Sequence, residues 1–235
     1  MRISSLYALN EALRKRQATV HVTDLSRGED WVFVEGQQVR HPMAAEISKA
    51  LETGKSVVVN SGGDEIFLNA QRPPPVIVII GAVHISQSLA RIARLAGFDV
   101  GIIDPRTAFA SAGRFKDVDV TAEWPADVLQ DRPLDRYTAL VAVSHDAKID
   151  DWPIMEALMR GCFYVGALGS LKTHASRLER LRRQGLTDGD LSQIHAPIGL
   201  DIGAANPAEI AVAILAEIIQ AARSPMRSRV EARGP

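Results

Sequence analysis

The sequence predicts an α/β fold, in which a parallel sheet with helices on both faces follows a small α+β N-terminal domain. From residue 76 onward, apolar runs of strand length alternate with stretches of helical periodicity, as in strands joined by crossover helices. Residues 1–70 instead contain short strand-like runs, two helical stretches and turn residues. The run QRPPP at 71–75 predicts a stiff linker between the two parts.

The elements of the small domain follow from periodicity and turn residues. Leu6, Leu9 and Leu13 recur on one face of a short helix, for which Ser4 or Ser5 is the expected cap. Two glycines within the turn 61–64 predict a hairpin. The other elements expected here are strands over 18–23 and 31–35, a helix over 42–53, and hairpin strands over 56–60 and 65–69.

The stretch 76–106 predicts a strand, a tight loop, a helix and a second strand, and it carries the clearest functional signal. The β-branched run 76–80 suits a strand that is buried on both faces. Apolar residues at three- and four-residue intervals then predict a helix, which Gly97 ends. Asp104 follows the second strand, 23 residues after Gly81, near where a dinucleotide-binding unit has the carboxylate that binds a ribose.

The loop between that first strand and its helix keeps only the first glycine of the G-x-G-x-x-G pattern. Gly81 permits the sharp turn and Ser86 allows close packing, but Val83 replaces the glycine that lets backbone approach a pyrophosphate. The helix start, with Ala82, Val83 and His84, is still a predicted anion site because its N–H groups are free. A nucleotide-type ligand and a ligand-free structural unit are both open interpretations.

The alternation of strands and helices continues to the end of a large domain over residues 76–222. Asn206 is the expected cap of the last helix, and Pro207 its first residue. The tail 223–235 is rich in Arg, Ser and Pro, so it is expected to be disordered. The other expected elements are strands over 116–121, 138–143 and 163–167, and helices over 124–129, 152–159 and 170–184.

Ligands of open parallel sheets bind beyond the carboxyl ends of the strands, so the loops at those ends are the candidate site. Four loops qualify, over 81–86, 104–106, 144–146 and 166–170, and the Gly- and Pro-rich segment 195–203 is a fifth that closes over the same crevice. No residue is assigned as catalytic or metal-binding. The candidate cofactor-binding residues are Gly81, Ala82, Val83, His84, Asp104, Arg106, Ser144, His145, Asp146, Gly166, Gly169, Ser170, Gly199, Asp201 and Gly203, with His195 at the same edge.

Some of these residues have a structural alternative. Histidines in loops often stabilise a turn, and this is the alternative role of His84, His145 and His195. Asp104 precedes Pro105, so its alternative role is to stabilise an Asp-Pro turn. A second set of cations, in the predicted helix 170–184, alternates with leucines, which predicts a solvated face; a docking patch for an acidic partner or a phosphate is the alternative. Its members are Lys172, Arg177, Arg180, Arg182 and Arg183.

Composition limits the function classes further. The net charge of −1 over 235 residues gives no basic field for nucleic acid or an anionic membrane. The single cysteine, Cys162, excludes an internal disulfide and a C-x-x-C motif, and is expected to be a small buried residue. No apolar run approaches the ~20 residues of a membrane span, and no signal-peptide core is present, so a cytoplasmic protein is expected.

Five segments carry a resemblance to a known family: PPPVIVIIGAVHI, GFDVGIIDPR, SHDAKIDDWP, FYVGALGSLKTHASRLERL and IHAPIGLDIGAANPAEIAVAILAEI. Together, over about residues 73–220, they resemble the XdhC/CoxI family, accessory proteins of molybdenum hydroxylases such as xanthine dehydrogenase and carbon monoxide dehydrogenase. The resemblance implies a Rossmann fold for the large domain. It also implies a chaperone that binds the molybdopterin cofactor or its dinucleotide form, protects it during sulfuration and delivers it.

The same resemblance implies partners: an apo-molybdoenzyme of the xanthine dehydrogenase family, a cysteine desulfurase and a second copy in a homodimer. The family's usual segment, which carries a glycine-rich motif and a C-G-G motif, is absent from residues 1–70. These residues are a shortened counterpart of it, which argues against cysteine-based handling of the cofactor there. An NAD(P)-dependent oxidoreductase is the alternative function, although no Tyr-x-x-x-Lys pair is present. A purely structural partner role would leave the polar edge unexplained.

Overall fold

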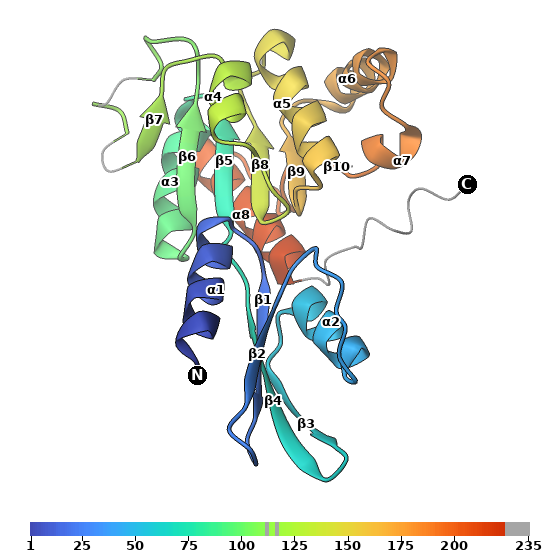
Figure 1. The fold of residues 1–235 in the computed structure, drawn as a ribbon. Coiled ribbons are helices and arrows are strands. Elements are labelled where there is room, and N and C mark those ends of the chain that lie inside the picture. The colour runs from blue at the N-terminus through green and yellow to red at the C-terminus, as the bar shows by residue number, and fades with distance from the viewer. Residues whose placement is uncertain (111–112, 116–117, 224–235) are drawn as a thin grey trace. The chain divides into compact units, whose positions relative to one another are not determined.

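The computed structural model describes residues 1–110, 113–115 and 118–223. The described chain forms two compact units, residues 1–73 and 74–223 (Figure 1). No helix among the described residues is long and apolar enough to cross a membrane.

The larger unit is built on a six-stranded sheet in which all neighbouring strands are parallel. The strand order is β10-β9-β8-β5-β6-β7, so the chain runs outward from β5 to one edge and then returns to build the other half. This order confirms the predicted Rossmann-like sheet, and it puts the topological switch point between β5 and β8. The strands are β5 (Val76–Ile80), β6 (Asp99–Ile103), β7 (Asp119–Thr121), β8 (Thr138–Ala142), β9 (Tyr164–Ala167) and β10 (Ile194–His195).

Helices cover both faces of this sheet, as predicted (Figure 1). Alternate residues of β5 supply the two cores: Ile77 and Ile79 belong to one, and Ile80 to the other. On the first face lie α3 (His84–Leu95) and α8 (Pro207–Arg223), which pack on each other. The other core is covered by α4 (Pro125–Asp131), α5 (Ala147–Arg160), α6 (Leu171–Arg183) and α7 (Asp188–Leu191).

Several boundaries differ from the sequence prediction. Helix α5 begins at Ala147 and not at Trp152, because the Asp146 side chain caps it by accepting a hydrogen bond from the Lys148 N–H at 2.9 Å. The short α7 and β10 were not predicted, and Arg223, expected in the tail, ends α8. Residues 116–117 of the expected strand 116–121 and residues 224–235 of the expected tail lie outside the described residues.

The small unit is a four-stranded antiparallel sheet of order β2-β1-β4-β3 with a helix on each face (Figure 1). Its apolar core lies under α2, where Ile47 and Ala50 pack with Val20, Val22 and Leu68 of the sheet. The elements are α1 (Ile3–Arg14), β1 (Thr19–Asp24), β2 (Asp30–Val34), α2 (Ala44–Thr53), β3 (Val57–Ser61) and β4 (Asp64–Gln71).

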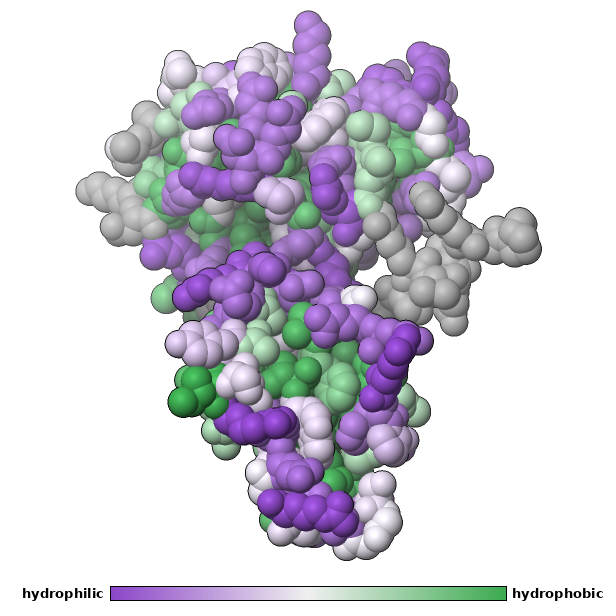
Figure 2. Space-filling model, viewed as in Figure 1, coloured by the Kyte–Doolittle hydropathy of each residue, from purple (hydrophilic) through white to green (hydrophobic). Residues whose placement is uncertain are grey.

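Helix α1 does not bury the leucine face that its periodicity predicted. The buried residues of α1 are Ser5 and Ala12, whereas Leu6 and Leu13 are 44% and 57% exposed. Apolar residues are accordingly seen at the surface of this unit (Figure 2). The reason is a polar layer beneath α1, centred on the buried Asp30 carboxylate. Hydrogen bonds from Ser5, His21 and Arg2 hold the pKa of Asp30 well below its usual range.

The predicted helical cap of α1 is also absent. Arg2 occupies the N-cap position without a side-chain capping bond, so neither Ser4 nor Ser5 caps the helix. Ser5 instead bonds to Asp30, and the Arg2 side chain reaches the same carboxylate through its Nε atom at 2.9 Å.

The packing of α3 on the sheet gives a direct test of the larger core. Leu89 is fully buried, so Leu89→Ala is expected to lower the free energy of unfolding by about 2–5 kcal/mol. Leu95, in the same helix, is 89% exposed, so Leu95→Ala is the matched control and should cost less than about 0.5 kcal/mol. Equilibrium urea unfolding measures both values, and equal losses would contradict the described orientation of α3.

Candidate functional site

At the switch point, the loops that follow β5 and β8 touch. Gly81 has a left-handed φ of +109°, and a Cβ atom at this position would lie 2.7 Å from the backbone N of Ser144. Only glycine tolerates both the conformation and the approach. The ends of β6 and β9 flank this contact, so the loops 81–86, 104–106, 144–146 and 168–170 follow four adjacent strands.

Asp104 lies at the end of β6 with a side chain that is fully buried. Its carboxylate accepts hydrogen bonds from the Ala82 N–H at 2.7 Å and from the Arg106 N–H at 3.0 Å. The Arg106 guanidinium adds bonds from Nε at 2.9 Å and Nη2 at 2.8 Å. Burial alone would raise the pKa of Asp104, but these bonds outweigh burial and lower it. The carboxylate expected to meet a ribose therefore fixes the β5 loop and Arg106.

Arg106 presents a cation at this edge. Its side chain is 32% exposed and stacks on the Phe109 ring, with the guanidinium carbon 4.6 Å from the ring centroid. The hydrogen bonds to Asp104 raise the pKa of Arg106, and the nearby charges of Asp146 and Asp150 add to the effect. Since one Asp104 oxygen bonds both Arg106 and the Ala82 N–H, the cation lies beside the start of α3.

The loop before α3 has the geometry of a helix start. Val83 is the N-cap residue in extended conformation, and its side chain is partly buried against the apolar core. His84 is exposed at the first helical position. Ser86 is buried as expected, and its hydroxyl donates to the Gly81 carbonyl at 2.5 Å, which ties the helix to the turn.

The loop after β8 is a turn closed by its own side chains. The Ser144 hydroxyl accepts a hydrogen bond from the Asp146 N–H at 3.1 Å, and Asp146 caps α5. Between them, His145 is exposed and has a φ of +66°, a region that few non-glycine residues occupy. Of the three predicted residues, only His145 directs its side chain to solvent without a structural role in the turn.

A buried charge cluster behind this turn was missed from the sequence. Asp150 is 1% exposed and accepts a bond from the Ser144 N–H at 3.3 Å, and burial raises the pKa of Asp150 to about 6. Arg177 is 3% exposed, so its predicted position on a solvated face is wrong. It donates Nη2 to the Leu168 carbonyl at 2.9 Å, and Asp151 lies 4.0 Å from its Nε atom.

The carboxylates of α5 explain why this arginine turns inward, because a buried cation requires opposite charge nearby. The other members of the predicted basic face, Lys172, Arg182 and Arg183, are exposed, and Arg180 pairs with Asp151. The signal for the cluster was Asp150 four residues after the capping Asp146, which places it in the first turns of α5. A helix start at Trp152 concealed that spacing.

The segment 166–170 divides between strand and loop. Gly166 lies inside β9, in agreement with the expected strand 163–167, so the loop begins after it and not at residue 166. A Cβ atom at Gly166 would come within 2.6 Å of Ile198 and of the Tyr164 hydroxyl. Gly169 has a φ of +139°, and Ser170 caps α6 by accepting a bond from the Thr173 N–H at 3.2 Å.

The fifth segment is anchored away from the switch point. Glu217 of α8 accepts hydrogen bonds from the Gly199 N–H at 2.8 Å, from the His195 Nδ1 atom at 2.9 Å and from the Tyr164 hydroxyl at 2.6 Å. The His195 side chain and the Gly199 N–H thus bond to α8, while the His195 backbone belongs to β10. Two further candidates, exposed in the same loop, are Asp201 and Gly203. Cys162 is half-buried at the edge of the core, less buried than expected.

The raised pKa of Asp150 predicts a pH dependence of stability. The native state binds this proton more tightly than the unfolded chain, whose pKa is near 3.8, so ionisation of Asp150 costs stability as pH rises from about 4 to about 6. In Asp150→Asn this loss is absent, and the variant should gain about 3 kcal/mol relative to the natural chain between pH 4 and pH 7.

Chemical unfolding at a series of pH values measures this gain. The matched control is Asp99→Asn, which changes an exposed carboxylate at the start of β6. Its free energy of unfolding should differ from that of the natural chain by the same amount at every pH. A constant difference between Asp150→Asn and the natural chain over the whole range would disprove the effect.

Comparison with known proteins identifies relatives of this chain. The family model of the XdhC Rossmann domain matches residues 77–218. The chain is 32% identical over 66% of its length to a Bacillus subtilis protein named as a probable subunit of xanthine dehydrogenase, and covers 45% of it. It is 30% identical over 77% of its length to the molybdenum cofactor insertion chaperone PaoD of Escherichia coli, and covers 49% of it.

A third relative, the uncharacterized protein YqeB of Escherichia coli, is 29% identical over 68% of this chain, which covers 29% of that protein. The chain thus spans less than half the length of each of these relatives. A solved structure described as a xanthine dehydrogenase from Bacillus halodurans superposes with a TM-score of 0.67 at 22% identity, covering 94% of this chain and 67% of that one, and so supports the fold. Since the family model spans more than half of the sequence, the chain belongs to the XdhC family.

Proposed function

We propose that this protein is a maturation chaperone that binds a phosphorylated pterin cofactor of the molybdopterin type and delivers it to an apo-molybdoenzyme of the xanthine dehydrogenase family. The observation that carries the proposal is the Asp104–Arg106 pair at the switch point, which holds a cation beside the start of α3. The names of two relatives, one a cofactor insertion chaperone and the other a probable part of xanthine dehydrogenase, agree with this function.

The chemistry of the edge favours an anionic group on the ligand. A guanidinium and the N–H groups at a helix start both bind phosphate oxygens, and Arg106 and α3 bring the two donors together. The exposed side chains of His84, His145 and Ser170 lie in the loops of the same edge and offer further polar contacts. The cofactor is proposed as molybdopterin or its dinucleotide form, since either carries a phosphate.

The proposed partners follow from the function. The apo-molybdoenzyme receives the cofactor, and a cysteine desulfurase provides the sulfur for its sulfuration. Cys162, the single cysteine of the chain, lies outside the four loops, so the sulfur carrier belongs to the desulfurase. A homodimer is proposed on the family resemblance alone.

The second candidate function is that of an NAD(P)-dependent oxidoreductase, which the strand order and the switch-point loop favour. Two features oppose the usual binding mode of NAD. Asp104 is already bonded by Arg106, so a ribose hydroxyl would have to displace that pair. Val83, in place of the second glycine of the pattern, restricts the approach of a pyrophosphate.

Binding and reconstitution assays test the proposed function. The natural chain should bind molybdopterin in calorimetry and accelerate reactivation of the apoenzyme without NAD turnover. Arg106→Met removes a charged hydrogen-bond donor, so cofactor affinity should fall about ten- to a hundred-fold. Arg132→Met removes an exposed arginine that pairs with Asp119 at the opposite end of the sheet, and should retain full affinity. Substrate-dependent NADH formation without cofactor binding would refute the chaperone function.

Val83→Gly separates the two candidate ligands. The substitution adds backbone freedom, which by itself should cost about 0.5–1 kcal/mol of stability, and it removes a partly buried side chain together with the obstacle to a pyrophosphate. If the loop takes the pterin cofactor, the variant should bind the cofactor more weakly and gain no measurable affinity for NAD. Calorimetry with both ligands on both proteins measures this, and unchanged binding of both would remove the loop 81–86 from the site.

A further inference from the structure

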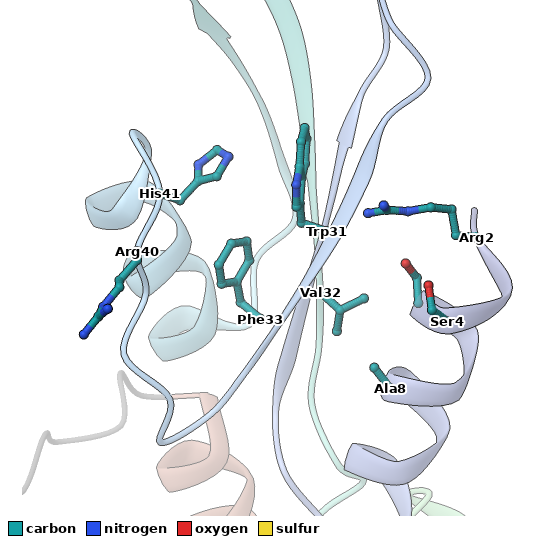
Figure 3. Close-up of a pocket in the computed structure, with 9 residues that line it drawn as sticks. Arg2, Ser4, Ala8, Trp31, Val32, Phe33, Arg40 and His41 are labelled. Atoms are coloured by element: carbon teal, nitrogen blue, oxygen red, sulfur yellow. The ribbon is translucent and has the colours of Figure 1, made fainter.

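An open groove of about 410 Å³ follows the outer edge of β2 in the small unit (Figure 3). One wall comes from α1, the floor from β2, and the other wall from the segment before α2. All of the lining residues belong to this unit, and none of them is acidic. They are Arg2, Ser4, Ser5, Ala8, Trp31, Val32, Phe33, Arg40 and His41.

The groove exposes a strand edge. In the described chain β2 pairs with β1 on one side only. The Asp24 N–H donates to the Glu29 carbonyl, and the Glu35 N–H donates to the Ala18 carbonyl. With the register of the two strands, these bonds show that the odd-numbered residues of β2 hydrogen-bond to β1 and the even-numbered ones do not. Val32 is one of the even-numbered residues and directs its N–H and C=O away from β1.

The outward carbonyls on either side of Val32 are already bonded. Arg2 donates Nη2 to the Asp30 carbonyl, and the Gln37 N–H donates to the Val34 carbonyl at 3.1 Å. Val32 is therefore the position at which this edge can pair with another strand.

The two walls of the groove differ in character. Trp31 and Phe33 point to one face of β2, where the His41 ring lies 5.5 Å and 5.7 Å from their ring centroids (Figure 3). Val32 points to the other face, toward Ser4 and Ala8 of α1 (Figure 3). One wall is thus aromatic and the other is lined by small and polar side chains.

Two arginines and a histidine give the groove hydrogen-bond donors. His41 accepts a hydrogen bond from the Met43 N–H at its Nδ1 atom, which leaves Nε2 as its donor. Arg40 is exposed, and the Arg2 side chain is 61% exposed although it pairs with Asp30. An occupant with carboxylates complements these groups, whereas a basic occupant would be repelled.

We propose that the edge of β2 binds an extended peptide segment of a partner protein, in which acidic residues alternate with apolar ones. The peptide adds a fifth strand through the N–H and C=O of Val32. Its apolar side chains pack on Trp31 and Phe33, and its carboxylates, which alternation places on the other face, meet Arg2 on the α1 side. This site lies in the small unit, and the proposed cofactor site lies in the larger one.

A second copy of the chain is a less suitable occupant. Pairing of two β2 edges would bring Arg2 and Arg40 of one copy toward the same arginines of the other, and like charges oppose such pairing. The oligomeric state is therefore measured alongside peptide binding.

The probe is the peptide acetyl-EFEVEVE-amide, titrated into the full chain and followed by calorimetry and by the Trp31 indole N–H resonance. Val32→Pro removes the outward N–H without breaking the ladder to β1, because proline is tolerated on such an edge. Affinity should fall at least about ten-fold. The matched control is Val58→Pro on β3, at the opposite edge of the sheet, and it should leave affinity unchanged.

A charge-reversal variant keeps the test independent of the proline. Arg2→Glu should weaken binding of the acidic peptide and strengthen binding of acetyl-KFKVKVK-amide. Equal binding of both peptides to the natural chain, or full binding by Val32→Pro, would overturn the proposal. Dimerisation of the free chain that Val32→Pro abolishes would also overturn it in favour of the second copy.

Discussion

The Asp104 carboxylate joins three parts of the larger unit. It bonds the β5 loop through the Ala82 N–H, its own loop through the Arg106 N–H, and the Arg106 guanidinium. A carboxylate at the end of the second strand of such a fold is usually available to a ribose. Here Arg106, two residues later, bonds both oxygens of the Asp104 carboxylate. Asp104 therefore holds a cation at this edge instead of accepting hydrogen bonds from ligand hydroxyl groups. The anion-binding character proposed for this edge depends on that cation.

Two buried carboxylates at this edge, Asp104 and Asp150, have pKa values shifted in opposite directions although burial acts on both in the same way. Hydrogen bonds from a guanidinium and two N–H groups more than compensate the desolvation of Asp104, so its pKa is lowered. Asp150 lacks a direct bond from Arg177, and the Ser144 backbone donor lies at 3.3 Å, so desolvation dominates and its pKa rises. One carboxylate therefore stabilises the native loops, and the other costs stability near neutral pH.

The small unit has an apolar core under α2 and a polar layer under α1. Because the polar layer admits only small side chains from α1, the larger apolar residues of that helix remain at the surface. The groove beside β2 lies at the edge of the sheet, between the α1 face and the α2 face. Its lining combines an aromatic wall on the α2 side with serines of α1 and the arginine that precedes this helix.

The sequence by itself determined the parallel sheet, the helix after Gly81 and the loops at the strand ends, because apolar periodicity and glycine positions are local properties. It also determined that Ser86 packs against the turn. Only the tertiary structure decided that Asp104 turns to Arg106, that Arg177 is buried against the carboxylates of α5, and that the segment 195–203 attaches to Glu217. The last two outcomes depend on partners distant in sequence, and the first depends on the burial of Asp104 beside the distant Ala82 N–H, which local patterns do not encode.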